Sequence, residues 1–153
     1  MARRSILILV AVVAAIAVVT VAVTASGASK GTTVKTRSTE LGTVLVNNKA
    51  VTLYLFEKDK HGKSACSGAC AQNWPPLITK GKPRAAGKAI ASKLGTTKRS
   101  DGRKQVTYNG HPLYTFVLDK GKPGSTKGEG VDAFGAEWYV VGTNGRKIED
   151  DEG

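Results

Sequence analysis

Cysteine, histidine, aromatic and acidic residues are all scarce in this chain of 153 residues. Two cysteines permit at most one internal disulfide, which excludes a disulfide-dense miniprotein. Nine aromatic side chains suffice for one modest core, and the length leaves room for one compact domain. Long apolar runs are missing everywhere except at the N-terminus. These shortages exclude a large multidomain enzyme and a polytopic membrane protein.

Several catalytic motifs are missing as well. The sequence has no Ser-x-x-Lys and no His-Glu-x-x-His. Either of its two histidines, His61 and His111, could act as a general base, but neither stands in a nucleophile motif. The glycine-containing segment 128–130 lacks the strand and helix that flank a phosphate-binding loop. We therefore expect a protein that is not an enzyme and that holds no cofactor.

Acidic residues are outnumbered, with 12 Asp and Glu against 23 Lys and Arg, for a net charge of +11. Four of the acids fall in the acidic tail, residues 149–153, so residues 26–148 carry a net charge of +13. Such a body attracts polyanions, which outside the membrane are lipid headgroups, wall phosphates and acidic polysaccharides, and not nucleic acid. Because no run of five or more cations occurs, lysines that merely keep the domain soluble are the alternative.

The one long apolar run lies near the N-terminus. Residues 6–23 carry no charge, and these 18 residues exceed the apolar part of a cleaved signal and reach the lower limit for a membrane span. Arg3 and Arg4 are expected to hold the start of the chain in the cytoplasm, so that the remainder is exported. We expect residues 1–25 to form an apolar helix that serves as a signal or anchor. An uncleaved membrane anchor is favoured over secretion after cleavage near Ala25.

The rest of the chain repeats itself at an offset of 60 residues. Leu53–Lys60 aligns with Leu113–Lys120, with five of eight residues identical, and a tryptophan follows each segment. Such a self-match indicates duplication of one supersecondary unit. Residues 26–40 are rich in Ser, Gly, Thr and Lys and predict a flexible linker. Residues 41–148 are expected to form one domain. Its two repeats span about residues 41–78 and 95–148.

β-Branched and aromatic residues dominate this body, with turn residues between them. Asn109-Gly110 favours the hairpin turn that matches strand twist. A short helix is expected within residues 67–73, and a strand near residues 90–94. The predicted hairpins are residues 43–46 with 52–56, 105–108 with 111–117, and 138–141 with 146–148. The predicted fold class is all-β, with two related antiparallel hairpin repeats in one compact domain, preceded by the N-terminal apolar helix.

Aromatic residues recur at matched positions of the two repeats. Tyr54 and Phe56 lie two residues apart, so a strand places both rings on one face, as it does for Tyr114 and Phe116. An aromatic platform for a sugar, haem or another flat ligand is one interpretation. Packing of the two faces against each other is favoured, because neither repeat can bury an apolar face alone. The tryptophans of the two repeats are expected to fill the space beside these rings: Trp74 and Trp138.

An aspartate closes each of the two aromatic strands. Asp59 and Asp119 are expected to accept hydrogen bonds from backbone amides of the loops that follow them. A calcium site is disfavoured at Asp59 because the next residues, Lys60 and His61, repel a cation. A pair of catalytic carboxylates would require the two repeats to bring both aspartates close together, which nothing in the sequence indicates.

Cys66 and Cys70 are separated by three residues. Outside the cytoplasm they are expected to form a disulfide that closes a small loop. The spacing differs from the Cys-x-x-Cys of redox sites, and no histidine follows Cys70 to indicate haem attachment. A copper or zinc site formed by His61, Cys66 and Cys70 is the weaker alternative, since it requires free thiols and a fourth ligand.

The Tyr-x-Phe-x-x-Asp pattern at residues 54–59 and 114–119 resembles the tandem Tyr-x-aromatic-x-x-Asp signature of the bacterial secreted-repeat family of predicted lipoproteins. Residues 62–77, 109–114 and 134–140 are also similar to that family, and the resemblance covers about residues 40–148. Many members carry a lipid on a cysteine near the N-terminus, which this chain lacks. The resemblance implies no established activity.

These observations together predict a non-catalytic, exported repeat protein of the cell envelope. Its expected role is binding or structural, with the positive body resting on anionic envelope polymers or lipid headgroups. The alternative is a metal- or cofactor-handling protein in envelope electron transfer.

Overall fold

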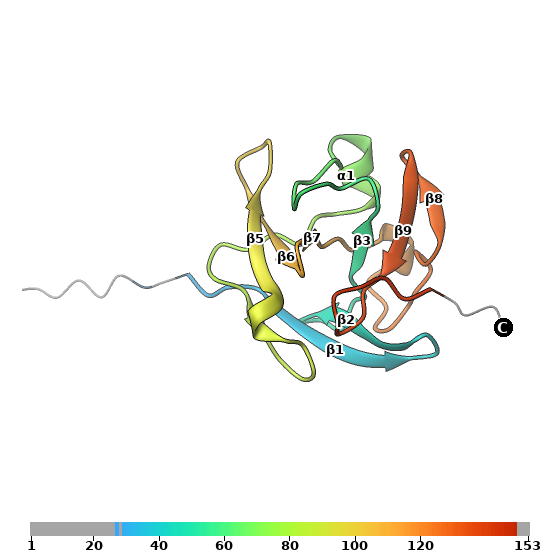
Figure 1. Cartoon of the computed structure of the whole chain (residues 1–153), viewed down its shortest axis with the longest axis horizontal. Coiled ribbons are helices and arrows are strands. Elements are labelled where there is room, and N and C mark those ends of the chain that lie inside the picture. The colour runs from blue at the N-terminus through green and yellow to red at the C-terminus, as the bar shows by residue number, and fades with distance from the viewer. Residues whose placement is uncertain (1–26, 28, 150–153) are drawn as a thin grey trace, which may run out of the picture.

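The computed structural model describes residue 27 and residues 29–149 of the chain (Figure 1). The predicted N-terminal helix, with the membrane contact expected of residues 6–23, lies outside the described residues, as do residues 150–153 of the acidic tail. Within the described part of the chain, no helix is long and apolar enough to cross a membrane.

Short strands make up most of the regular structure, in agreement with the all-β prediction. In chain order the elements are β1 (Thr33–Thr39), β2 (Gly42–Asn47), β3 (Tyr54–Phe56), α1 (Ala69–Asn73), β4 (Arg84–Ala85), η1 (Ala91–Lys93), β5 (Leu94–Lys98), β6 (Lys104–Tyr108), β7 (His111–Pro112), η2 (Val117–Asp119), β8 (Val131–Ala133) and β9 (Ala136–Val140). Helix α1 lies within the predicted residues 67–73 and stops before Pro75 and Pro76, which cannot continue a helix.

The strands form three small sheets, ordered β2-β1-β4, β3-β9-β8 and β5-β6-β7. Each repeat starts with an antiparallel hairpin, β1–β2 in the first repeat and β5–β6 in the second. The turn between β6 and β7 has positive φ at both Asn109 (51°) and Gly110 (80°), which only a turn of the predicted hairpin type requires. The hairpin predicted around these two residues is therefore confirmed for residues 111–113, whereas Tyr114 and Thr115 pair with the first repeat and Val117 begins η2.

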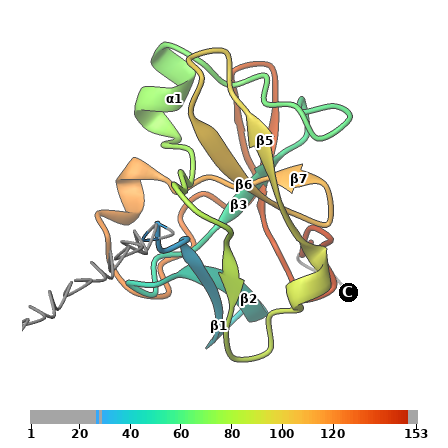
Figure 2. The same cartoon turned by 90° about the vertical axis from the view of Figure 1, so that its left-hand side faces the viewer.

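The two repeats meet at the centre of the domain, where β3 of the first lies beside β7 of the second (Figure 2), and each tryptophan belongs to a segment that joins strands of the other repeat. Strand β9 carries Trp138 and pairs antiparallel with β3 of the first repeat. In the reciprocal arrangement the chain after Trp74 runs along the second repeat, where Leu77 N donates to Leu113 O at 2.9 Å and Val106 N donates to Leu77 O at 2.8 Å. The two repeats are therefore interlocked, and neither forms a closed unit without the other.

The folded domain starts earlier than the sequence predicts. Residues 33–39, inside the expected flexible linker 26–40, form β1 and pair along their length with β2. Val34 is fully buried, and β4 pairs in parallel with the start of β1. The Thr, Lys and Ser residues that suggested a linker are equally suited to a strand with one face in water. The linker prediction is therefore wrong for residues 33–39.

Two further predictions of strands differ from the structure. Residues 43–46 lie in β2, whose main partner is β1, while residues 52–56 meet β2 only through Leu53 N, which donates to Leu45 O at 3.0 Å, and a neighbouring bridge. Residues 91–93 form η1, and the strand expected near residues 90–94 begins at Leu94. Local patterns indicated strands in both regions, but they could neither choose between competing partners nor place the start of β5 after η1.

Two apolar clusters lie on opposite faces of the first motif segment. Alternation along the chain sends Tyr54 and Phe56 into an aromatic cluster, and Leu53 and Leu55 into an aliphatic one. All four side chains are buried. This segment is therefore a central strand of the molecule, and an apolar cluster covers each of its two faces.

Candidate functional site

The two repeat motifs meet at the centre of the domain through their tyrosines. Tyr54 N donates to Tyr114 O at 2.8 Å, and Tyr114 N donates to Tyr54 O at 3.0 Å. The side chains then cross to the opposite repeat: Tyr54 Oη donates to Asp119 Oδ2 at 2.7 Å, and Tyr114 Oη donates to Asp59 Oδ2 at 2.8 Å. We call these two contacts the crossed Tyr–Asp pairs. Each links a tyrosine of one repeat to the aspartate of the other.

The pair of Tyr54 and Asp119 is enclosed by the loop after η2. Asp119 is 1% exposed, and its Oδ1 accepts hydrogen bonds from Ser125 Oγ at 2.6 Å and from Lys127 N at 3.1 Å. Gly128 N donates to Tyr54 Oη at 3.2 Å. Burial, and then the hydrogen bond to Asp119, raises the pKa of Tyr54 well above its ordinary value. The phenol therefore stays protonated and serves as a donor.

Gly128 lets this loop lie directly against the aromatic rings. A Cβ at this position would lie 2.7 Å from Tyr54 Cε1 and 2.8 Å from Trp74 Cη2, so no larger residue fits without moving a ring. The glycine-containing segment 128–130 is thus part of the ring packing. Neither a strand before it nor a helix after it forms the surroundings of a phosphate-binding loop.

The pair of Tyr114 and Asp59 is less enclosed. Asp59 Oδ1 accepts a hydrogen bond from Ala65 N at 2.7 Å, and Tyr114 Oη also lies 2.7 Å from Ser64 Oγ. Burial raises the pKa of Asp59 to about 6, and the Ala65 and Tyr114 donors and the charge of Arg99 only partly oppose this rise. Burial, together with the charge of Asp59, raises the pKa of Tyr114 above its ordinary value.

A buried arginine extends this second pair into a polar network that the sequence did not predict. Arg99 is 7% exposed; its Nη1 donates to Ser64 Oγ at 2.9 Å and to Gln105 Oε1 at 2.7 Å, and its Nη2 donates to Cys66 O at 2.6 Å. Gln105 Nε2 in turn donates to Leu113 O at 2.8 Å. The network ties the disulfide loop to β6. The one signal for this network in the sequence was Gln105, a polar residue beside the apolar residues of a predicted strand.

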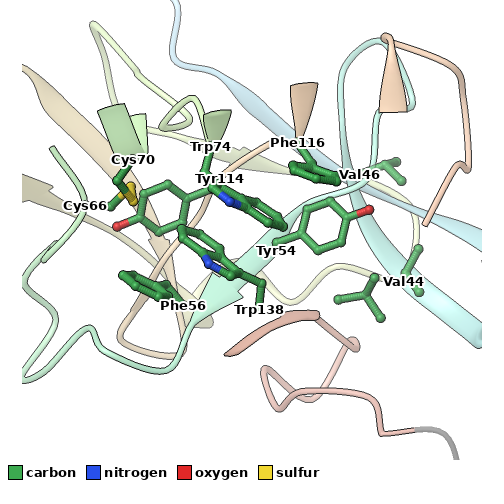
Figure 3. Packing of buried hydrophobic residues seen from close by; sticks show 11 residues of the cluster. Val44, Val46, Tyr54, Phe56, Cys66, Cys70, Trp74, Tyr114, Phe116 and Trp138 are labelled. Atoms are coloured by element: carbon green, nitrogen blue, oxygen red, sulfur yellow. A yellow bond between two sulfur atoms is a disulfide. The ribbon is translucent and has the colours of Figure 1, made fainter. Parts of the chain in front are cut away.

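The aromatic residues between the crossed pairs form a continuous stack (Figure 3). Trp74 and Trp138 lie parallel with ring centroids 3.9 Å apart, and each tryptophan carries a phenylalanine on its other face, with centroids 4.0 Å apart. Tyr54 and Tyr114 meet the two tryptophans edge-on, at 5.4 Å and 5.1 Å. The stack in order is Phe56, Trp138, Trp74 and Phe116.

The rings of this stack are covered by protein and not by solvent. All six aromatic side chains are less than 9% exposed, and Phe116 at 8% is the most exposed. The structure therefore brings together every aromatic residue singled out from the sequence. It places their faces against one another, which leaves no open aromatic platform among them.

The two cysteines form the predicted disulfide, Cys66–Cys70, at the start of α1. Both are buried, and Cys66 belongs to the aromatic cluster. Their sulfurs are bonded to each other and are not thiolates, while His61 is exposed in the preceding loop. Among the described residues, no group of three or more His, Cys, Asp and Glu side chains is placed to hold a metal ion.

A cleft of about 410 Å³ is lined by carboxylates and a histidine, which are the residue types that commonly act as general acids and bases. It is bordered by Glu57, Asp59 and His111, together with Arg146 and Lys147. Burial lowers the pKa of His111, which is about half buried. Both oxygens of Asp59 already accept hydrogen bonds, and Glu57 pairs with Lys147 Nζ at 3.0 Å. These carboxylates are therefore engaged within the protein.

The sequence also contains one Gly-x-Ser-x-Gly pattern, at residues 27–31. A nucleophilic serine in that pattern requires a sharp turn from a strand into a helix. Here residues 29–31 lead directly into β1, with no strand before them among the described residues and no helix after them. The pattern therefore lacks the structural setting of a nucleophile.

A family model described as a secreted repeat of unknown function matches the chain twice, over residues 35–78 and 95–142. These two matches lie close to the repeats expected from the sequence, and together they cover more than half of the chain. No curated protein and no solved structure is significantly similar to it. The chain belongs to the family of secreted repeats of unknown function.

Proposed function

We propose that this protein is a non-catalytic, exported component of the cell envelope that binds anionic envelope material through its basic surface. The observation that carries the proposal is the crossed arrangement of the motif. Its tyrosines and aspartates form hydrogen bonds between the two repeats, and its aromatic rings pack in the core between them. What the domain presents to a partner is therefore its loops and sheet edges.

That outer surface is strongly basic. Residues 29–149 contain 21 of the 23 Lys and Arg residues but only nine Asp and Glu. Of the described cations, only Arg99 is buried. A surface with this imbalance attracts polyanions over a distance set by the ionic strength. Membership of a secreted family supports a location where such polyanions are lipid headgroups, wall phosphates and acidic polysaccharides.

The proposal includes retention at the membrane by residues 6–23, which supply the uncharged run that an anchor needs.

The absence of a catalytic role is supported by the hydrogen bonds that the carboxylates already make within the protein. Asp119 is enclosed, and the oxygens of Asp59 accept hydrogen bonds from neighbours in the fold. A general base needs an oxygen or nitrogen free to reach a substrate proton.

Retention on a charged polymer tests the proposed function. Full-length protein in detergent is passed over immobilised polyphosphate, with immobilised dextran as the uncharged control. We expect retention on polyphosphate at 0.1 M salt and release by 1 M salt, because the screening length falls from about 10 Å to about 3 Å. Equal retention on dextran, or retention that salt does not change, would contradict electrostatic binding.

A further inference from the structure

A basic groove of about 960 Å³ lies on the described surface. It lies where the chain enters the domain, and its walls come from residues 29–31, residues 81–85, η1, β5 and β6. Four of its lining residues are cations, Lys30, Lys82, Arg84 and Lys104, and none is acidic. We call this hollow the entry groove. Its charge fits a phosphate-bearing ligand.

The chain is fixed to the domain at this groove. Thr32 N donates to Thr79 Oγ1 at 3.0 Å, Thr32 Oγ1 donates to Ile78 O at 2.8 Å, and Arg84 N donates to Thr32 O at 2.9 Å. Glycines at positions 31 and 81 allow two backbones to cross here, because a Cβ on either glycine would overlap a carbonyl of the other segment. Residues 29–32, which belong to the expected flexible linker, are therefore fixed against residues 78–84 of the domain.

This attachment limits how far the groove can stand from an anchor. Only residues 24–28 separate the apolar run from the residues that line the groove. Six Cα–Cα steps, from residue 23 to residue 29, reach at most about 20 Å when fully extended. The headgroup layer itself is roughly 5–8 Å thick on each side of the hydrocarbon core. The entry groove is thus held within reach of the headgroups of the membrane that contains residues 6–23.

We propose that the entry groove binds the phosphate of anionic phospholipid headgroups and so orients the domain on its membrane. This inference rests on the membrane anchor of the proposed function. Charge alone would equally suit a soluble wall polyphosphate. The membrane is favoured because the anchor presents headgroups to the groove at a short, fixed distance, whereas a soluble polymer has no such preference for this end of the molecule.

Lysine acetylation in nanodiscs tests this proposal with the full-length chain. The protein is reconstituted in discs of phosphatidylcholine and in discs that also contain phosphatidylglycerol, and mass spectrometry measures the acetylation rate of each lysine. We expect Lys30, Lys82 and Lys104 to react about fivefold more slowly in the anionic discs. Lys49 and Lys122 are exposed, do not line the groove, and should react at the same rate in both discs.

A matched pair of double variants separates the groove from overall charge. Lys82→Gln with Arg84→Gln should abolish most of the protection of Lys30 and Lys104. Lys49→Gln with Lys122→Gln removes the same charge elsewhere and should leave the protection at about fivefold. Uniform protection of every exposed lysine, or equal rates in the two discs, would overturn a specific headgroup site.

Two further outcomes distinguish this inference from the proposed function. If soluble polyphosphate protects the groove lysines in neutral discs more than anionic lipid does, the ligand is a polymer; the headgroup assignment is then wrong, while envelope binding stands. If the chain does not purify with discs of either composition, the anchor is wrong, and the orientation argument fails with it.

Discussion

Each motif tyrosine completes the hydrogen bonding of a carboxylate from the other repeat. Asp119 is almost fully enclosed, and a buried carboxylate that loses a donor keeps the full cost of its desolvation. Tyr54 supplies one of its three hydrogen bonds, beside those from Ser125 and Lys127. The hydroxyl is thus both a crosslink between repeats and a donor that this buried carboxyl group needs.

Tyr54→Phe should therefore lower the free energy of unfolding by about 2–3 kcal/mol. The ring and its packing remain in this variant, so the loss of stability measures the contribution of the hydroxyl group. Tyr139→Phe is the matched control, since that hydroxyl bonds the exposed Glu137 on the surface and its removal should cost less than about 0.5 kcal/mol. Urea denaturation of the two variants measures the difference. Equal losses would show that the crossed pair adds nothing beyond a surface hydrogen bond.

Asp59 predicts a pH dependence of stability. Burial raises its folded pKa to about 6, above the ordinary 3.8, so the folded state holds this proton at pH values where the unfolded chain has released it. Its contribution is present below about pH 4 and is lost as the pH rises through 6. After a discount for partial exposure, we expect a loss of about 1–2 kcal/mol from pH 4 to pH 7.

Asp59→Asn should remove that part of the pH dependence, because the amide stays uncharged throughout. The exposed Asp132 provides the control, and Asp132→Asn should leave the pH profile unchanged. Denaturation at pH 4, 5.5 and 7 gives the profiles. If wild type and Asp59→Asn show parallel profiles, the carboxyl titrates at its ordinary pKa.

At the level of elements, the ring stack joins segments that no single sheet connects. Its four rings come from β3, β9, the end of α1 and the residue before η2, and successive rings alternate between the first and second repeat. Each stacked contact contributes about 0.5–1.5 kcal/mol beyond the burial of area. The stack therefore stabilises the interface between repeats and not either repeat by itself.

Double-mutant cycles should detect this order of rings. Phe56→Leu and Trp138→Leu remove neighbours in the stack and should show a coupling energy of about 1 kcal/mol. Phe56→Leu and Phe116→Leu remove the two ends, which the tryptophans separate, and should be additive within about 0.5 kcal/mol. Denaturant unfolding of the single and double variants measures both cycles. Additivity in the first cycle would contradict a contribution from stacking.

At the scale of the whole molecule, the exchange of tryptophan-bearing segments makes each repeat depend on the other for its fold. Strand β9 completes the sheet of the first repeat, and the segment after Trp74 completes the strands of the second. A half-chain would leave strand edges unpaired and its aromatic face exposed, both of which are unfavourable in water. We therefore expect the two repeats to fold as one cooperative domain.

Residues 29–93 and 94–149, produced separately, should each lack stable structure, and mixing them should restore the sheet spectrum and slow amide exchange. Far-ultraviolet circular dichroism and hydrogen exchange provide the measurements. A half-chain of the same length that carries Trp74→Ala is the control, since it should fail to complement. If either half proves stably folded alone, the repeats are independent units that merely dock.

The sequence by itself determined the features that depend on neighbours along the chain. The alternation that places Tyr54 and Phe56 on one face, the Asn109-Gly110 turn and the disulfide follow from spacings of a few residues, and the duplication follows from a direct self-match of the sequence. Short-range periodicity and turn chemistry act before any tertiary contact exists, so they can be predicted from local patterns.

Only the tertiary structure decided which distant segments pair. The crossing of Tyr54 to Asp119, the burial of Arg99 and the pairing of β1 within the expected linker all join residues far apart or compete with a plausible local alternative. Their outcome depends on the free energy of burying whole faces and of satisfying buried polar groups together. That balance is a property of the assembled molecule, and no short window of residues contains it.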